Sequence, residues 1–290
     1  MEDQIRGWLR NQGYPLEMRT AAAFRDAGFR VVQSEYYHDP ETSDWRECDV
    51  IADMSWKLQP DGIPVRVMFV VECKTSREKP WLLFTSPGKG IAGRARVVQR
   101  VSTPVGREWL KRISQRHDIQ SLSLFQVSPT PAYGIVQAFK SREGQDVTYM
   151  AAIAAAKAAR AMTQGLTSRS GRLINKWAIL ALPMVVTEAR LFNCCLDENN
   201  QNQLNVEEAT SGDLLWRNPI AGLPHTIIKI VNTRHLEPFI KRAAHDAETL
   251  MSTTSSELNE SADWLRSHGG PLADDLLFNP DSHEGPIARR

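Results

Sequence analysis

Three charged residues on two apolar segments have the types and spacing that metal-dependent chemistry requires. Residues 70–74 read Val-Val-Glu-Cys-Lys, and because side chains alternate along a strand, Glu72 and Lys74 share a face while Cys73 points into the core. Asp49 runs directly into an apolar Val-Ile-Ala segment. Carboxylates beside an apolar core are costly unless they are compensated. A divalent cation between Asp49 and Glu72 would compensate them, since Mg²⁺ prefers carboxylate oxygens and keeps several waters.

The elements that must position these residues are predicted from periodicity and turn residues. Apolar residues at helical spacing predict a helix over 13–27, which ends at Gly28, a natural C-cap. Strands are predicted over 29–37, 46–54 and 64–75, separated by polar turns at 38–44 and 59–62. Because both turns are short, the three strands are expected to form an antiparallel meander.

The remainder of the chain is less regular, and its elements are predicted as follows. Helices are expected over 105–115, over much of the Ala-rich stretch 133–164, and over 236–250; strands are expected at 121–127, 176–186, 191–196, 203–209 and 225–232. Pro183 weakens the strand at 176–186, because proline cannot donate to a ladder. We predict one α/β domain over residues 1–250 and a polar, partly flexible tail with one short helix over 251–290.

The arrangement resembles the PD-(D/E)XK phosphodiesterases, the restriction-endonuclease-like superfamily. An acidic residue on one strand and Glu-x-Lys on the next form the core motif of that family, and Asp49, Glu72 and Lys74 match it. Glu17, on the first predicted helix, is similar in position to an acidic residue that many members carry. The literal Pro-Asp dipeptide is absent, since Cys48 precedes Asp49. A lone Glu-x-Lys is common and is often a surface ion pair, so the resemblance depends on the combination.

The resemblance implies an αβββαβ core with a mixed central sheet flanked by helices, and a role for each residue. Asp49, Glu72 and the Cys73 backbone carbonyl would bind Mg²⁺ or Mn²⁺, and Glu17 would bind a second ion or position the first through water. Lys74 would orient the attacking water and stabilise charge on the scissile phosphate. Glu47 shares a face with Asp49 and is either an extra ligand or a solvated residue.

The net charge of +1 conceals an uneven distribution along the chain. Residues 1–73 carry 8 Lys/Arg against 13 Asp/Glu, residues 74–187 carry 18 against 5, and residues 188–290 carry 9 against 16. The central basic block predicts a surface for a phosphate backbone, unless folding interleaves the charges. Its candidate nucleic-acid contacts, within a basic insertion over about 76–130, are Lys89, Arg94, Arg96, Arg100, Arg107 and Lys111.

A glycine pattern in this insertion has a second interpretation. Residues 88–93 fit G-x-G-x-x-G, which in a strand–turn–helix unit would cradle a dinucleotide. The arginines that follow fit a basic loop closing on nucleic acid better. Four cysteines without a C-x-x-C spacing are expected to be reduced thiols, and no signal peptide or membrane span is apparent, so a cytoplasmic protein is expected.

The sequence therefore predicts a divalent-metal-dependent nuclease acting on DNA, of the kind that serves restriction, phage defence or repair by analogy. Two alternatives stay open: a catalytically inactive nucleic-acid-binding subunit that keeps the fold, and a partner-docking protein that uses its acidic C-terminal region. A double-strand cut by a fold with one site would call for a homodimer.

Overall fold

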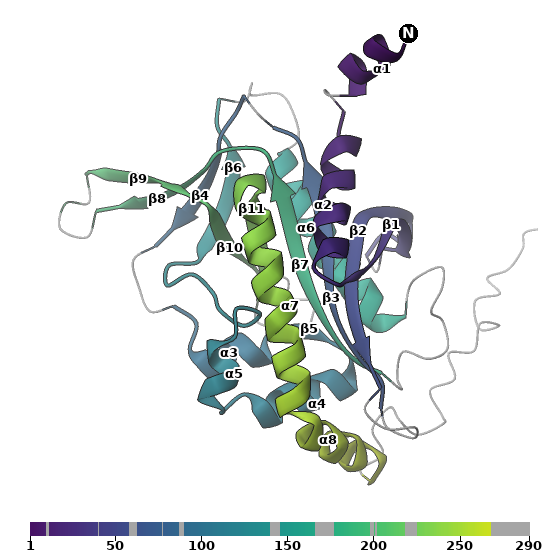
Figure 1. The fold of residues 1–290 in the computed structure, drawn as a ribbon. Helices are drawn as coiled ribbons and strands as arrows, with labels where there is room; N and C mark the ends of the chain where they lie inside the picture. The colour runs from purple at the N-terminus through teal and green to yellow at the C-terminus, as the bar shows by residue number, and fades with distance from the viewer. Residues whose placement is uncertain are drawn as a thin grey trace, which may run out of the picture.

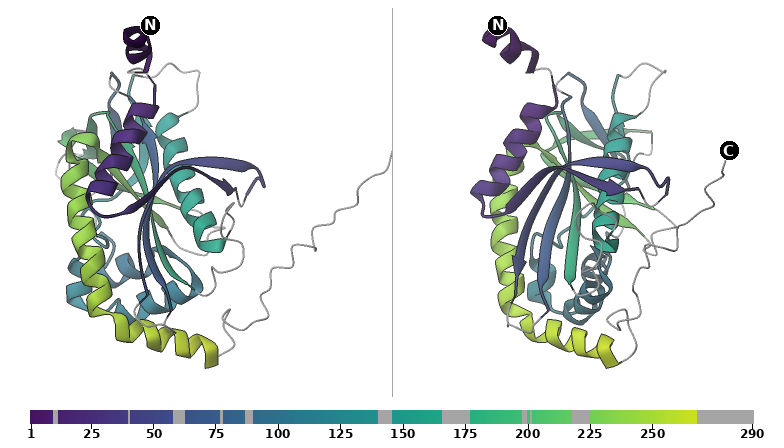
Figure 2. Two further views of the ribbon diagram at one scale, coloured as in Figure 1. Left: turned by 45° about the vertical axis from the view of Figure 1, so that its right-hand side comes forward. Right: turned by 90° about the vertical axis from the view of Figure 1, so that its right-hand side faces the viewer.

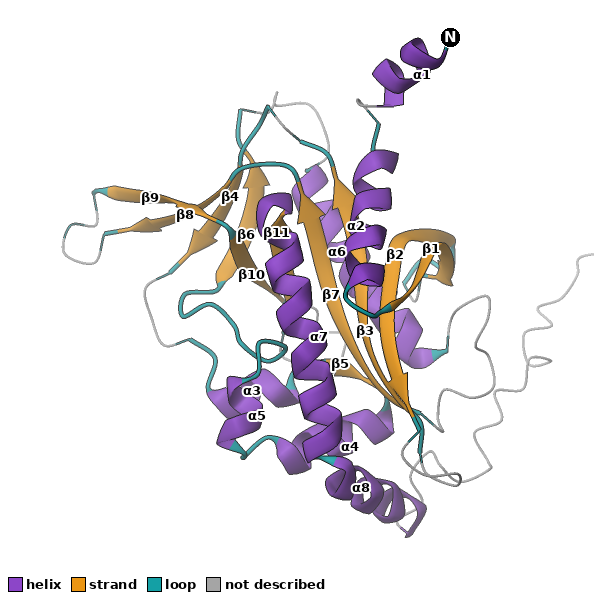
Figure 3. Cartoon of the chain, viewed as in Figure 1, coloured by secondary structure: helices purple, strands orange, loops and turns teal. Residues whose placement is uncertain are grey.

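The computed structural model describes residues 1–9, 12–39, 41–57, 63–76, 78–86, 90–139, 146–165, 177–197, 200, 202–217 and 225–267. Within this part of the chain a single mixed sheet forms the centre of the molecule (Figures 1 and 3). In spatial order its strands are β1 (Arg30–His38), β2 (Trp45–Trp56), β3 (Val65–Lys74), β7 (Ala178–Thr187), β11 (Thr226–Asn232), β10 (Ser211–Trp216), β6 (Ala132–Gln137), β4 (Trp81–Thr85), β8 (Leu191–Leu196) and β9 (Leu204–Ala209). The short strand β5 (Val101–Ser102) pairs with β7.

The predicted antiparallel meander is confirmed, since β1 pairs with β2 and β2 with β3 in antiparallel register. The first helix ends as predicted: Gly28 has a left-handed φ of 89°. Its N–H donates to the Arg25 carbonyl, and the Phe29 N–H donates to the Phe24 carbonyl. This pair of bonds is the Schellman arrangement, which uses glycine because it adopts positive φ without a steric penalty.

Helices cover both faces of the sheet. α2 (Tyr14–Asp26) and α7 (Leu236–Thr253) lie on one face, and α6 (Val147–Gln164) lies on the other (Figure 2). α3 (Gly93–Val98), α4 (Pro104–Ile113), α5 (His117–Ser121) and α8 (Ser255–Ser267) gather near the end at which β3 and β7 begin (Figure 1). The helix α1 (Glu2–Leu9) buries no residue, and the short helix η3 (Thr233–His235) leads into α7.

The two faces have separate cores with different packing. Aromatic rings fill the α2 face, where Phe24 packs edge-on against Phe29 at 5.2 Å and tilted against Phe69 at 5.4 Å. On the opposite face α6 buries alanines along most of its length, and small side chains let a helix approach a sheet closely. Both cores include side chains of β3 and β7, so these strands are buried on both faces.

The middle of the chain departs from the sequence prediction. Residues 122–127 form a turn rather than a strand, because their apolar side chains are buried by tertiary packing and the Ser123 N–H donates to the Asp246 carboxylate. The Ala-rich stretch is helical only from Val147; its first part contains β6. The strands β4 and β10 were not foreseen, and β8 pairs with β4 and β9.

Pro183 lies inside β7, and the pairing of the strand explains how it is tolerated. The Ile179 carbonyl accepts the Thr103 N–H, and the Ile179 N–H donates to the Thr103 hydroxyl, on the β5 side of β7. The backbone N–H and C=O groups of the odd-numbered residues of β7 therefore point to that edge. β5 is paired with β7 up to Ala181, and β11 begins to pair at Met184. The proline nitrogen therefore falls between two neighbouring strands, at a position where the ladder needs no donor.

The predicted division at residue 250 falls inside α7, and residues 251–267 belong to the packed body. Leu258, Ala262 and Leu265 of α8 are buried in the same core as α4, because α8 folds back against that helix. Residues 268–290 of the predicted tail lie outside the described residues.

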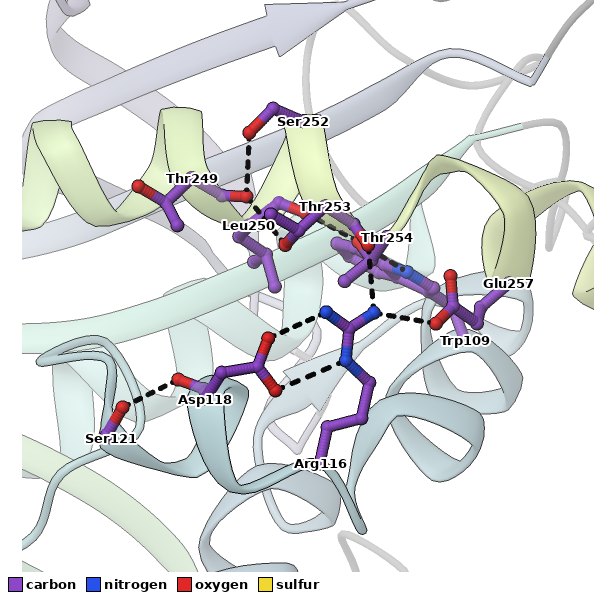
Figure 4. Close-up of polar contacts among 10 residues, drawn as sticks. All are labelled: Trp109, Arg116, Asp118, Ser121, Thr249, Leu250, Ser252, Thr253, Thr254 and Glu257. Carbon is purple, nitrogen blue, oxygen red and sulfur yellow. Dashed lines mark hydrogen bonds and ion pairs between the residues drawn. The ribbon is translucent and has the colours of Figure 1, made fainter.

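An arginine connects this C-terminal part to the middle of the chain (Figure 4). The Arg116 guanidinium contacts the Asp118 carboxylate at 2.6 Å and the Glu257 carboxylate at 2.7 Å, and donates to the Thr253 carbonyl at 2.8 Å. Because these groups come from the α5 turn, the end of α7 and the start of α8, one side chain joins three segments.

We predict that Gly106→Ala destabilises the protein. A Cβ at Gly106 would lie 2.7 Å from the Ile179 carbonyl oxygen, because the first turn of α4 packs directly on the β7 backbone. Relief of that contact requires a backbone shift, at about 1–3 kcal/mol of unfolding free energy. Chemical denaturation measures the change. Gly7→Ala is the matched control, since no atom lies within 4 Å of its added Cβ. Equal stability of the two variants would contradict the tight approach.

Candidate active site

The structure brings Asp49, Glu72 and Lys74 together at the end of β3. The Lys74 Nζ lies 2.9 Å from Glu72 Oε2 and 3.7 Å from Asp49 Oδ2. One ammonium thus contacts both carboxylates, which places them a few ångströms apart. Glu72 is only 4% exposed, and Cys73 points to the opposite, α2 face as the alternation predicts.

A local irregularity in the sheet positions the Asp49 carboxylate. Antiparallel pairing of β2 with β3 stops at Val50 and Val71, and Asp49 Oδ2 then accepts the Cys73 N–H at 2.7 Å. On the β1 side, the residue opposite Asp49 is Ser34, which has a left-handed φ of 55°. The Cys73 carbonyl points to the same strand edge as its N–H, so the candidate oxygen ligands Asp49 and Cys73 face one edge.

The helix α2 carries Glu17 into the same neighbourhood. The Cys73 thiol contacts the Thr20 hydroxyl at 3.6 Å, and Arg19 forms a 2.7 Å ion pair with Glu188 just after β7. These two contacts fix the helix against the ends of β3 and β7. Glu17, Asp49 and Lys74 then line an open pocket of about 390 Å³.

Six further residues that line this pocket were not predicted as site residues. Among them are Ser76, Trp81 and Gln137, and the Gln137 side chain donates to the Ser76 hydroxyl at 2.7 Å. The Trp81 indole N–H is buried and has no hydrogen-bond partner among the described residues. Trp81 and Gln137 lie on the paired strands β4 and β6. Sequence reasoning missed Trp81 and Gln137 because β4 and β6 are far apart in the chain, so their pairing has no local signal.

The charges of the site strongly influence one another. Burial raises the pKa of Glu72 to about 7; the Lys74 ammonium opposes this shift, and the Asp49 carboxylate adds to it. Burial alone would lower the pKa of Lys74, but Glu72 and Asp49 outweigh it and raise that pKa. Burial, followed by the negative charges of Asp49 and Glu47, raises the pKa of Glu17. The site therefore carries more negative charge than one ammonium offsets.

These residues suit a hard divalent cation with a largely aqueous shell. Among the described residues, no three His, Cys, Asp or Glu side chains form a group able to enclose a metal. Mg²⁺ does not need such a group, since it is commonly bound through one or two carboxylates and retains waters. Asp49 and Glu72, with the Cys73 carbonyl on the shared edge, would hold it. Asp49, Cys73 and Lys74 line the pocket, whereas Glu72 does not. Glu17 adds negative charge from the other side.

The predicted nucleic-acid contacts lie elsewhere in the molecule. Arg94, Arg96, Arg107 and Lys111 lie on α3 and α4, whereas Lys89 is outside the described residues. α4 begins beside Ile179, which is level with Arg66 of β3. Lys74 is eight residues further along that strand, or roughly 26 Å at about 3.3 Å per residue. The structure thus separates these basic residues from the candidate active site.

Arg100 is not a surface residue. It is 5% exposed, its guanidinium donates to the Gln126 carbonyl, and burial lowers its pKa to about 10. The neighbouring Asp213 carboxylate opposes that shift. Arg100 therefore belongs to a buried polar cluster and cannot contact a phosphate backbone in this conformation.

Part of the basic block is neutralised by acidic residues from distant segments. Besides the Arg116 contacts, Arg112 pairs with Glu260 of α8 at 3.2 Å, and Lys157 pairs with Glu41 at 2.7 Å. At these positions, folding therefore places basic and acidic residues side by side, as the alternative interpretation of the charge distribution expected. Arg94 and Arg107 are exposed, and their side chains form no ion pair with another described residue.

The glycine pattern at 88–93 lacks the surroundings of a dinucleotide site. The helix that follows it, α3, is only six residues long. The next strand, β5, pairs with β7 and not with β4, so β4, α3 and β5 do not form a parallel βαβ unit. Residues 87–89 lie outside the described part of the chain.

Comparisons of the chain with protein-family models, with curated proteins and with solved structures find no match. In the described residues, no helix combines the length and the apolar character needed to cross a bilayer. The four cysteines are free thiols, as the sequence predicted. The functional interpretation therefore depends on the geometry of the site.

We predict that Glu72→Gln stabilises the metal-free protein at alkaline pH. An unfolded glutamate loses its proton near pH 4.5, whereas folded Glu72 keeps its proton to about pH 7. Its contribution to stability is therefore present below pH 4.5 and is lost as the pH rises to 7. Removing the ionisable group should raise the free energy of unfolding at pH 8 by about 2–3 kcal/mol.

Denaturation in chelator at pH 5 and pH 8 measures this effect. The wild-type protein should lose stability across that interval relative to Glu72→Gln. Glu47→Gln, which changes an exposed carboxylate on β2, is the control and should follow the wild-type profile. Parallel pH profiles for wild type and Glu72→Gln would show that the burial of this charge has no energetic consequence.

Proposed function

We propose that the protein is a divalent-metal-dependent nuclease that hydrolyses phosphodiester bonds, with DNA as its substrate. The observation that carries the proposal is the contact of one ammonium, Lys74, with the carboxylates of Asp49 and Glu72 at the end of adjacent strands. The order of the elements supports it. A helix, three antiparallel strands, a crossover helix and a parallel strand occur in chain order as α2, β1, β2, β3, α6 and β7, the order of an αβββαβ nuclease core, with β4, α3, β5, α4, α5 and β6 inserted between β3 and α6.

In this proposal the chain supplies charge and positioning. Asp49, Glu72 and the Cys73 carbonyl would hold a divalent metal, which would supply Lewis acidity and lower the pKa of a bound water. Lys74 holds its ammonium at the pocket, where it stabilises negative charge on the phosphoryl oxygens and orients the attacking water. Glu17 adds a carboxylate from α2 that can hydrogen-bond a water opposite Asp49.

An inactive nucleic-acid-binding subunit is the second candidate, and one observation favours it. Lys74 already contacts both carboxylates, so the ammonium itself provides the charge compensation that a metal would otherwise provide. A partner-docking role for the acidic C-terminal region has less support, because Glu257 and Glu260 of α8 pair with Arg116 and Arg112 of the same chain.

We predict cleavage of plasmid and oligonucleotide DNA in Mg²⁺ or Mn²⁺, abolished by chelator, and a specific loss in Lys74→Ala. The ammonium matters most in the transition state, where charge grows on the phosphoryl oxygens. Single-turnover cleavage should therefore fall by about 10²–10³-fold. Equilibrium binding to the same duplex should fall far less, because other cationic side chains remain.

Lys79→Ala is the matched control, since it removes an exposed lysine five residues further along the chain. It should cleave at the wild-type rate. Equal proportional losses of binding and cleavage in Lys74→Ala would reduce Lys74 to a phosphate contact. Absence of metal-dependent cleavage by the wild-type protein, with intact DNA binding, would favour the inactive-subunit alternative.

We predict that the α3–α4 surface extends the nucleic-acid contact beyond the pocket. Neutralising Arg94 and Lys111 together should weaken duplex binding and reduce the slope of log affinity against log salt by about two, one per lost phosphate contact. Fluorescence anisotropy across a salt series measures both quantities. Unchanged affinity and slope would show that the α3–α4 surface does not contact nucleic acid. That result would not affect the proposed nuclease site around Lys74.

A further inference from the structure

The strand β9 forms one edge of the sheet. It pairs with β8, and no other described strand pairs with it. The two strands extend away from the helices that cover the rest of the sheet (Figure 1). The opposite edge strand, β1, is interrupted at Ser34 by a left-handed φ, whereas the β8–β9 register is regular throughout. An edge strand without a bulge, a proline or a lysine is open to pairing with a further strand.

The backbone groups available at this edge follow from the pairing with β8. The Asp197 N–H donates to the Gln203 carbonyl at 2.9 Å, just before β9 begins. Because the hydrogen-bonding direction alternates along a strand, the backbone groups of the odd-numbered residues of β9 face β8. The N–H and C=O groups of Leu204, Val206 and Glu208 therefore point outward, where a neighbouring strand would meet them.

The side chains at this edge form an apolar surface on one face of the sheet. Leu204 is 68% exposed and Val206 is 56% exposed. Leu196 of β8 lies directly opposite Leu204 and is 49% exposed. Directly opposite residues of an antiparallel pair share a face, so these aliphatic side chains lie side by side. Such a cluster beside outward-pointing ladder groups is typical of an interaction surface.

The charge of the edge restricts the kind of partner that fits it. Glu207 and Glu208 are exposed, and Arg190 already pairs with Glu208 at 2.7 Å. Carboxylates at this position repel a phosphate backbone, so the edge is unsuited to nucleic acid. A polypeptide strand with apolar and uncharged polar side chains is the matching partner.

A second copy of β9 has these properties. Two edge strands can form an antiparallel ladder only when their outward-pointing residues lie opposite each other, so even-numbered residues must face even-numbered residues. Placing Leu204 opposite the partner's Val206 meets this condition. It also brings the exposed aliphatic side chains of the two copies together on one face, because directly opposite residues share a face.

The same register keeps like charges apart. Glu207 lies across from the partner's Gln203, and Glu208 lies across from the partner's Asn202, so each carboxylate meets an uncharged amide. The next permitted register toward the C-terminal end of β9 would place Leu204 across from the partner's Glu208. A single register therefore matches apolar residues with apolar residues and leaves no glutamate opposite another.

We propose that the protein forms a two-fold symmetric dimer in which the β9 edges of two copies pair antiparallel and continue the sheet from one copy to the other. Leu204 exchanges backbone hydrogen bonds with the partner's Val206, and the two-fold axis makes the interface self-complementary. The inference does not rest on the proposed nuclease function, because β9 contributes no residue to the pocket around Lys74.

Sedimentation velocity of the full chain, from nanomolar to high micromolar concentration, tests the dimer. The dimer fraction should rise with concentration. Val206→Glu should raise the dissociation constant by about tenfold or more, because it places a carboxylate among apolar side chains. Ile5→Glu adds the same charge at a 50% exposed apolar position on α1 and should dimerise as the wild type does. A monomer at every concentration, or equal association of Val206→Glu and wild type, would overturn the inference.

A disulfide cross-link tests the register. In the proposed pairing Asn205 lies on the two-fold axis, opposite its own copy in a non-hydrogen-bonded pair, where Cα atoms are about 4.5 Å apart and a disulfide can form. Asn205→Cys should therefore give a covalent dimer under mild oxidation. A Cys195→Ser background is needed, since Cys195 lies opposite Asn205 within the hairpin and would compete.

Glu207→Cys in the same background is the matched control. It places a thiol on the same strand and the same face, but across from the partner's Gln203, so it should stay monomeric on a denaturing gel. Absence of a cross-link in Asn205→Cys, or an equal yield from Glu207→Cys, would overturn the proposed pairing.

Discussion

The parallel pairing of β3 with β7 is the constraint on which the rest of the structure depends. The two strands match residue for residue, from Val65 beside Ala178 to Lys74 beside Thr187. Parallel neighbours cannot be joined by a hairpin, so the chain must cross over, and it does so through α6 on one face. The same register fixes where β3 ends. The Thr187 hydroxyl donates to the Lys74 carbonyl at 3.0 Å, so the charged end of the strand is fixed by its neighbour.

The sequence was informative where structure is local. Alternation along β3 correctly placed Glu72 and Lys74 on one face, and Gly28 correctly ended the first helix, because strand periodicity and helix capping involve residues close in the chain. The Asp49 position was found from its type and neighbours. Its fixation by the Cys73 N–H was not, since it depends on where the β2–β3 pairing stops.

What could not be predicted depends on contacts between distant segments. Residues 122–127 have the composition of a strand, yet they form a turn under α7, because Asp246 captures a backbone N–H there. Pro183 is unfavourable in a central strand, because it lacks an N–H. It is tolerated in β7 because its nitrogen faces the interval between β5, which pairs up to Ala181, and β11, which pairs from Met184. The charge blocks behave in the same way. Arg116 and Arg112 in the basic block contact acidic residues of α8, so a linear count overstated the free positive surface.

The core on the α2 face also sets an order of events during synthesis. Its side chains come from α2, near the start of the chain, and from α7 and α8, whose last buried residue is Leu265. After Lys74 has been translated, about 190 further residues must be added before that core can close, which takes about 10–40 s at ~5–20 residues per second. Throughout that interval the aromatic surface of the nascent meander, including Phe69, has no helical cover from the C-terminal side. The growing chain therefore exposes part of its apolar sheet face until its last helices emerge.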